Sequence, residues 1–381
     1  MRSDKIHIIT LDRFFPDGGA GGGGAVQSCN KVLFGESLDG IPLKYSFYDD
    51  NEYTRDRTND LWDLFGAVAF AMEKTEDDVS SAYVTHDYGT AFGLFLLGKN
   101  YALVYHLQGS RVEEKLNSGE RFSKFSEKII QYCEKLALAG AQMVCFPSDG
   151  AYNYFCNSRY KTIETSEFER GRTLYNTLYA FPEPVKIDGI ERISDCITFL
   201  SIGQLTRAKG MDRHAGFFSA LLAKADGHKR FRYIFVGSGV LEGPIISALD
   251  RLKLRYPNFS YNHIPHCSYA EIRYLQSISD VYLMRHRISI FDPSALEAMK
   301  SGKAIILSSV GGNPEFNREN NIILCDDPTQ AADRFLSADL TTLGAHNRQV
   351  YQTYFSDVVY KDAYLQLFKR LLAISHENIN E

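Results

Sequence analysis

The sequence predicts an α/β protein with two domains, each built on a parallel sheet. Three observations lead to this prediction. The chain has 381 residues, whereas a single domain usually has ~100–200. Short apolar, β-branched runs alternate with longer amphipathic stretches, which is typical of βαβ units. A segment with two prolines and several charges, 179–195, separates the two halves, and we interpret it as part of the interdomain linker.

Each half repeats the same rhythm of strands and helices. In the first half we predict strands at 5–11, 80–86, 101–107 and 141–148. A helix over 121–140 lies between the last two and ends at Gly140. In the second half we predict strands at 195–203, 230–239, 258–265, 280–286, 303–309 and 320–326. The resulting division is a first domain at 1–180, a linker at 181–196, a second domain at 197–345 and a helical segment at 346–381.

The composition excludes several classes of protein. Hydrophobic residues make up 44% and charged residues 23% of the chain, which excludes intrinsic disorder. The 42 basic and 47 acidic side chains give a net charge of −5, so the chain lacks the basic field of a nucleic-acid binder. The seven cysteines are scattered singly, which argues against a disulfide framework and a zinc ribbon. No targeting segment is visible, and we expect a cytoplasmic protein, with at most peripheral contact at the inner face of a membrane.

Six glycines lie between the first strand and the first helix, in the segment 16–33. Glycines let backbone N–H groups approach an anion closely, and a helix N-terminus favours negative charge. A phosphate-facing loop is therefore one interpretation. A plain surface loop is another, and a dinucleotide fingerprint at Gly19, Gly21 and Gly24 is a third.

The second half carries more specific signals. Arg207 and Lys209 follow a strand and precede a helix, so they should lie at the carboxyl edge of the sheet, where open α/β sheets bind ligands. Gly237 ends the next strand in a tight turn. Glu297 lies early in a helix that begins near Pro293. A carboxylate there could bind vicinal sugar hydroxyls while the helix N–H groups bind phosphate.

The order of these motifs resembles the family 4 retaining glycosyltransferases of GT-B fold. The resemblance is strongest in LEAMKSGKAII (296–306) and VGGNPE (310–315) and looser in 1–180. It implies two Rossmann-like domains facing each other across a cleft, with the C-terminal helix crossing back to the first domain. The second domain would bind a nucleotide-sugar, with a UDP-sugar favoured. The first would bind a glycan, glycolipid or glycoprotein acceptor.

The resemblance also implies roles for single residues. Gly23 and Gly24 would face the donor diphosphate, and His106 would border the donor sugar. Lys209 would bind phosphate, and Glu297 would hold the ribose. The base would be contacted by the stretch of His263, Ile264 and Pro265.

Two departures from the family pattern concern the donor. The family's diphosphate-binding arginine is Gln204 here, and Arg207 is the candidate to replace it. The first glutamate of the family's E-x(7)-E pair is Ser289, so the loop that meets the donor sugar reads S-I-F-D-P. Asp292 is the candidate to replace the lost carboxylate. The catalytic candidates are therefore His106, Asp292 and Glu297. The donor-binding candidates in this loop and at the helix start are Ser289, Phe291, Pro293 and Ser294.

The predicted reaction is glycosyl transfer with retention of anomeric configuration and without a metal or other cofactor. The chain has no D-x-D triplet and no H-E-x-x-H motif. Lys209, Arg207 and helix N-termini would stabilise the leaving diphosphate instead. Two alternatives stay open. One is an NAD-dependent oxidoreductase based on the glycine-rich loop, which leaves 197–315 unexplained. The other is a catalytically inactive, glycosyltransferase-like partner subunit.

Overall fold

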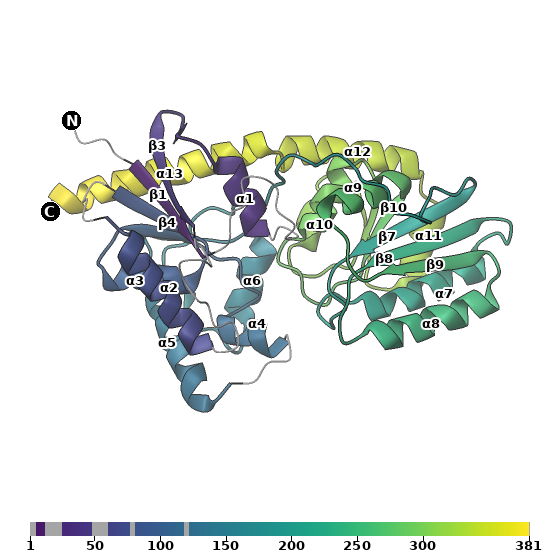
Figure 1. Ribbon diagram of the computed structural model, residues 1–381, viewed down its shortest axis with the longest axis horizontal. Coiled ribbons are helices and arrows are strands. Elements are labelled where there is room, and N and C mark those ends of the chain that lie inside the picture. Colours follow the sequence, from purple (N-terminus) through teal and green to yellow (C-terminus); the bar gives the residue numbers. More distant parts are fainter. Residues whose placement is uncertain (1–4, 12–24, 48–59, 77–80, 118–121, 381) are drawn as a thin grey trace. The chain divides into compact units, whose positions relative to one another are not determined.

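The computed structural model describes residues 5–11, 25–47, 60–76, 81–117 and 122–380 (Figure 1). Its contacts divide the chain into two units. Unit 1 contains the described residues up to Tyr179 and those from Asp357 onward. Unit 2 contains Ala180–Ser356. All ten strands expected from the sequence are present, each of them shorter at one or both ends than its predicted range.

Unit 1 contains a six-stranded sheet in the order β2-β3-β1-β4-β5-β6. The pairs β1/β3, β1/β4, β4/β5 and β5/β6 are parallel, and only β2/β3 is antiparallel. The strands are β1 (Lys5–Thr10), β2 (Ser37–Leu38), β3 (Ile41–Phe47), β4 (Ser81–Thr85), β5 (Tyr101–Val104) and β6 (Met143–Cys145). Taken in chain order, the five parallel strands lie 2-1-3-4-5, a doubly wound arrangement whose order reverses between β1 and β4.

The hairpin of β2 and β3 is an addition to the predicted strands. In β3, the sequence IPLKYSF mixes Pro and Lys with apolar residues, and every described position is partly or fully exposed. Tyr45 of β3 donates a hydrogen bond to the Leu33 carbonyl at 2.6 Å and packs against the sheet core. A half-buried edge strand gives a weak apolar signal, which is why the sequence alone did not indicate it.

Helices cover both faces of this sheet (Figure 1). They are α1 (Ala25–Leu33), α2 (Asp60–Lys74), α3 (Tyr88–Leu96), α4 (Arg111–Asn117), α5 (Lys124–Ala139), α6 (Asp149–Asn157) and α13 (Asp357–Asn380). One face packs on α1 and α13 through residues such as Leu33, Tyr364 and Phe368. A second cluster joins α2, α3, α4 and α5 through Leu64, Tyr88, Val112, Ile130 and Cys133. The last helix of the chain therefore belongs to the core of unit 1.

Unit 2 contains a fully parallel sheet in the order β12-β11-β10-β7-β8-β9. The strands are β7 (Cys196–Ile202), β8 (Arg230–Val236), β9 (Phe259–Ile264), β10 (Val281–Met284), β11 (Ala304–Leu307) and β12 (Ile323–Leu324). Read from β9, the order is 3-2-1-4-5-6, that of dinucleotide-binding Rossmann folds. The order reverses between β7 and β10, and in folds of this kind ligands bind at the point of reversal, outside the carboxyl ends of the strands.

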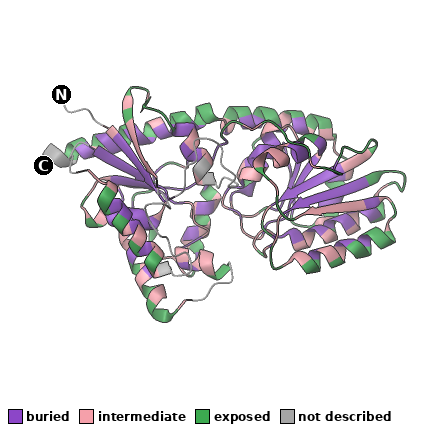
Figure 2. Ribbon diagram, in the orientation of Figure 1, coloured by how far each residue is buried: buried purple, intermediate pink, exposed green. Residues whose placement is uncertain are grey.

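The β7 side chains alternate between two helical layers. Phe199 contacts Phe217, Phe218 and Phe335, from α7 (His214–Lys224) and α11 (Pro328–Leu336). Leu200 and Ile202 belong to the opposite cluster with α9 (Tyr269–Ile278). The remaining helices are α8 (Glu242–Arg255), α10 (Pro293–Lys300) and α12 (Leu340–Tyr354). Figure 2 shows the resulting buried strands between helices whose outer faces are exposed.

The predicted linker residues pack along α9 of unit 2. The Val185 N–H donates to the Ala270 carbonyl at 3.1 Å. Ile187 and Ile190 join the apolar cluster under α9. The Tyr274 hydroxyl donates to the Ile190 carbonyl at 2.8 Å. This segment is thus attached to one of the two units along most of its length.

Candidate functional site

Two loops meet at the point where the strand order of unit 2 reverses. One follows β7 and carries Lys209, and the other follows β10. The Arg287 N–H donates to the Ala208 carbonyl at 2.8 Å, which joins the loops. Gly210 has a φ of +70°, and a Cβ there would lie 2.0 Å from the Arg285 carbonyl oxygen. Only glycine allows this close approach, so the sequence Lys209-Gly210 fixes where the lysine sits.

The Lys209 ammonium lies beside the buried carboxylate of Asp292. Its Nζ is 3.8 Å from Asp292 Oδ1, and the lysine side chain is 31% exposed against 3% for the aspartate. Asp292 Oδ2 accepts a hydrogen bond from the Tyr282 hydroxyl at 2.8 Å and lies 3.6 Å from His286 Nε2. Burial would raise the pKa of Asp292, but Lys209, His286 and the hydrogen bonds from Tyr282 and Ser294 together hold that pKa below its usual value. The aspartate is therefore ionised, and the lysine keeps an accessible face.

Asp292 is also the residue before α10, whose first residue is Pro293. Ser294 and Ala295 follow in the first turn. The Ser294 N–H is hydrogen-bonded to the Asp292 carboxylate, and the Ala295 N–H donates to the Asp292 carbonyl at 3.1 Å. Proline suits the first position because its missing N–H would be unpaired anyway. The positive end of the α10 dipole thus lies close to the Lys209 ammonium, an arrangement suited to a phosphate group.

Glu297 lies one turn further along α10 and is 9% exposed. Gln276 of α9 donates to its Oε2 at 2.9 Å, and the Tyr269 hydroxyl is a further hydrogen-bond partner. Burial raises the pKa of Glu297 to about 7, against the opposing effect of Gln276. A carboxylate with this pKa exchanges its proton near neutral pH, and in its ionised form it accepts hydrogen bonds from hydroxyl groups.

The loop before α10 is hydrogen-bonded to the segment that follows β11. The Gly312 N–H donates to the Ser289 carbonyl at 3.0 Å. A Cβ at Gly311 would lie 1.7 Å from that carbonyl oxygen. Ser289 is 6% exposed, and the Phe291 ring stacks on Phe316 at 4.2 Å. Phe291 is thus a core side chain, so any contact it makes with a donor would be through its backbone.

The other predicted donor residues of unit 2 lie at the ends of β8 and β9. Gly237 has a φ of +134°, and a Cβ there would lie 1.9 Å from the Gly203 carbonyl oxygen. His263 Nε2 is hydrogen-bonded to the Gly237 carbonyl at 2.8 Å, and its ring stacks on Phe235 at 4.5 Å. Ile264 ends β9, and Pro265 is exposed beyond it. These residues share the carboxyl edge of the sheet with Lys209.

Arg207 is exposed on the same loop as Lys209. Its carbonyl accepts a hydrogen bond from Arg287 Nη1 at 2.9 Å. Arg287 also forms a two-point ion pair with Asp212, with both N–O distances at 2.7 Å. The sequence interpretation did not include Arg287, His286, Tyr282 or Gln276. The first three lie on β10 or just after it, so polar residues at the end of a strand beside the reversal point were the available signal.

In unit 1, two histidines meet at the carboxyl edge of the sheet. His86 follows β4 and His106 follows β5, and His86 Nδ1 lies 3.1 Å from His106 Nε2. The His86 ring also stacks on Tyr364 of α13. Burial lowers the pKa of His106 to about 4, and burial together with His106 lowers the pKa of His86. Both rings are therefore neutral at pH 7. Gly23 and Gly24, the predicted diphosphate glycines, lie outside the described residues.

Two further observations bear on the class of protein. Within the described ranges, no three His, Cys, Asp or Glu side chains come together as a group that could hold a metal ion. None of the helices in those ranges is both long enough and apolar enough to cross a membrane.

Comparisons with known proteins concern the family and the fold. Residues 186–338 match the protein family described as glycosyl transferases group 1, and this segment includes every predicted donor-binding residue named above in unit 2. A search of curated proteins finds no significant match to the chain.

Solved structures show the same fold. An α,α-trehalose 6-phosphate synthase from Burkholderia multivorans is 12% identical at a TM-score of 0.66, covering 99% of this chain and 98% of its own. A trehalose-6-phosphate protein from E. coli, bound with UDP-2-fluoro glucose, is 13% identical at a TM-score of 0.63, covering 96% and 99%. A TarM mutant from S. aureus, in complex with fondaparinux, alpha-GlcNAc-glycerol and UDP, is 16% identical at a TM-score of 0.57 and covers 80% of this chain. This chain spans 59% of the TarM chain. The two Rossmann-like units thus have the architecture of the GT-B glycosyltransferases.

Proposed function

We propose that this protein is a retaining glycosyltransferase that moves a sugar from a UDP-sugar to a glycan, lipid-linked or protein-linked acceptor without a metal ion. One observation carries the proposal. Lys209, the start of α10 and the buried Glu297 come together at the carboxyl edge of the unit 2 sheet, where the strand order reverses. This is a site that offers positive charge and a hydroxyl-binding carboxylate side by side.

In this proposal the reaction depends on stabilising a leaving diphosphate. The Lys209 ammonium and the first N–H groups of α10 bind the phosphate oxygens, whose negative charge grows as the glycosidic bond breaks. Glu297 accepts hydrogen bonds from the ribose hydroxyls. Asp292 lies behind Lys209 rather than in the open. It therefore acts on the donor in two ways, by holding the ammonium in place and by setting the charge next to the sugar.

UDP is the favoured nucleotide because structures of similar fold contain it. The TarM mutant is in complex with UDP and the E. coli protein is bound with UDP-2-fluoro glucose. His106, whose ring is neutral and paired with His86, is the proposed residue that borders the donor sugar. Its Nδ1, the ring nitrogen that is not bonded to His86, can make one hydrogen bond with a sugar hydroxyl, as donor or acceptor according to the tautomer.

The direct test is a thermal-shift screen of UDP, ADP, GDP and their sugar conjugates, followed by assays of the conjugates that bind. A ligand at 100 times its Kd raises the free energy of unfolding by about 2.7 kcal/mol. We expect UDP and at least one UDP-sugar to raise the melting temperature, and NAD to leave it unchanged. Slow hydrolysis of the UDP-sugar, with NMR showing that the released sugar first keeps its anomeric configuration, would support retention.

Three outcomes would contradict parts of this proposal. Stabilisation by NAD alone would favour the oxidoreductase instead. A UDP-sugar that binds but is neither hydrolysed nor transferred would indicate an inactive partner subunit. An inverted product would remove the retaining mechanism while leaving the donor site in place.

A further inference from the structure

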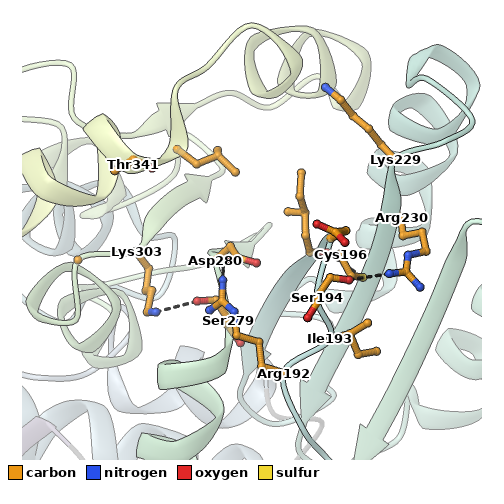
Figure 3. Close-up of a pocket in the computed structure, with 14 residues that line it drawn as sticks. Arg192, Ile193, Ser194, Cys196, Lys229, Arg230, Ser279, Asp280, Lys303 and Thr341 are labelled. Atoms are coloured by element: carbon orange, nitrogen blue, oxygen red, sulfur yellow. Dashed lines mark hydrogen bonds and ion pairs between the residues drawn. The ribbon is translucent and has the colours of Figure 1, made fainter.

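A cavity lined by several charged side chains lies at the opposite edge of the unit 2 sheet. It has a volume of about 600 Å³ and lies where β7, β8, β10 and β11 begin, with the start of α12 as a further wall. Lys209 and Glu297 lie beyond the other ends of these strands. Figure 3 shows the labelled side chains around an open space, with Lys303 and Thr341 on one side and Lys229 and Arg230 on the other. Proposed donor binding makes no use of these residues.

The cavity has an excess of positive charge. Its lining includes four cationic side chains, Arg192, Lys229, Arg230 and Lys303, and two carboxylates, Asp195 and Asp280. Asp280 is already engaged, since it accepts from Arg192 at 2.9 Å and from the Thr198 N–H at 2.9 Å. One ion pair therefore accounts for one of the four cations.

Of the other three cations, two are hydrogen-bonded to neutral backbone carbonyls and the third, the Lys229 ammonium, to no described residue. Arg230 donates to the Ser194 carbonyl at 2.6 Å, and Lys303 donates to the Ser279 carbonyl at 2.7 Å (Figure 3). No described residue is hydrogen-bonded to the Lys229 ammonium. A carbonyl fixes the position of a cation without cancelling its charge. These side chains are thus positioned while their charge stays available to a ligand.

We propose that this cavity is a second binding site, for a small phosphorylated molecule. The Arg230 guanidinium group presents the planar fork that matches phosphate oxygens, and Lys229 and Lys303 add point charges. A volume of about 600 Å³ lies within the range of small-molecule sites, roughly 300–1,000 Å³. It holds a phosphate together with an attached sugar-sized group. The site does not depend on the proposed transferase activity.

The test uses the full chain with Lys209→Ala, which removes the phosphate-binding lysine of the donor site. Isothermal titration calorimetry with inorganic phosphate and with a hexose phosphate then measures binding to the sites that are intact in this variant. In this background we compare the pair Lys229→Gln and Arg230→Gln with a matched pair on the exposed surface of α8, Arg251→Gln and Lys253→Gln. Both pairs remove two positive charges from the same domain. The net charge of the chain is then equal in the two variants.

We expect the hexose phosphate to bind more tightly than inorganic phosphate, because the cavity has room for more than the phosphate. The cavity pair, Lys229→Gln with Arg230→Gln, should weaken binding at least about tenfold, since each lost charge-assisted hydrogen bond is a large part of the affinity. The α8 pair should leave it unchanged. Higher salt should weaken binding as well.

Circular dichroism checks that each variant is folded. Lys229→Gln alone serves as a second variant, because the hydrogen bonds of this exposed lysine with described residues are made by its backbone and are kept in the variant. Equal loss in the cavity and α8 pairs would show a general charge effect and overturn the proposal. Absence of binding by both probes before the cavity is altered would overturn it too.

Discussion

The two units place polar side chains at comparable points of their sheets but with different charge. In unit 2, the edge where the strand order reverses carries an accessible lysine, an ionised aspartate and a glutamate with a pKa of about 7. In unit 1, the corresponding edge carries His86 and His106, both neutral at pH 7. A charged site suits a diphosphate, and a neutral hydrogen-bonding site suits hydroxyl groups.

Each unit also contains one buried glutamate with a pKa raised to about 7. In unit 1 this is Glu134 of α5, which accepts from the Tyr105 hydroxyl at 2.6 Å and the Arg111 N–H at 2.8 Å. In unit 2 it is Glu297, held by Gln276 at 2.9 Å. The same pKa shift thus arises in two settings. Glu134 joins a loop to a helix, whereas Glu297 lies at the sheet edge where we propose that the donor binds, so a shifted pKa alone does not identify a site.

The largest effect should come from the charged site. Lys209→Ala and Glu297→Ala should each lower kcat by ~10²–10³, because each removes one group preorganised toward the donor. Steady-state kinetics with the UDP-sugar found in the screen is the measurement. His7→Ala, a buried histidine of unit 1 bonded to Ser46, is a useful contrast that should affect stability more than turnover. Turnover near that of the unaltered protein in both site variants would remove the donor site from unit 2.

A smaller effect is expected where this sequence departs from the family pattern. Asp292→Asn should lower kcat/KM with the native donor roughly ten- to a hundredfold, since it removes the charge that holds Lys209 and a hydrogen bond from Tyr282. Ser289→Glu should change the ranking among UDP-sugars, because a site built around one pattern of hydroxyls discriminates against another. The measurement is relative kcat/KM over a donor panel. An unchanged rate and ranking in both variants would show that this loop does not select the sugar.

The contrast between the two glutamates can be sharpened through stability. An unfolded chain ionises Glu134 near pH 4.5, whereas the folded protein keeps its proton up to about pH 7. The neutral form therefore contributes stability that is fully present below pH 4.5 and is lost as the pH rises through 7. Between pH 4.5 and 8, the free energy of unfolding of Glu134→Gln should rise relative to that of the unaltered protein by on the order of 1–3 kcal/mol. Urea unfolding at several pH values measures this difference.

The exposed Glu36 supplies the control for that series. Glu36→Gln removes a carboxyl group from the surface, and its difference from the unaltered protein is measured over the same pH range. A Glu134→Gln difference that does not change with pH would mean that Glu134 is ionised in the folded protein.

The smallest expected effect is that of EDTA, which should leave kcat unchanged. The proposed site uses Lys209 and the N–H groups of α10 where other enzymes use a divalent cation. The assay compares kcat before and after dialysis against EDTA. A complete loss that Mg²⁺ or Mn²⁺ restores would show that a metal ion takes part.

The sequence by itself determined the strand and helix pattern of both units. Apolar, β-branched runs and amphipathic stretches record which residues face a core, because burial acts on each side chain where it stands. It also indicated Lys209 and Glu297 as donor-binding candidates, from their places after a strand and early in a helix and from the family resemblance. Gly210 needs a left-handed backbone, and Pro293 favours the first turn of a helix.

Only the tertiary structure decided which of these residues meet. Strands pair through backbone hydrogen bonds that are nearly independent of sequence, so the pattern could not show that β7 lies beside β10. That pairing places Asp292 behind Lys209 and buries it, whereas the sequence suggested a carboxylate open to the sugar. The edge strand β3 and the cavity of Arg192, Lys229, Arg230 and Lys303 were likewise not foreseeable. The partly exposed strand β3 gives only a weak apolar pattern, and the cavity is assembled from segments far apart in the chain.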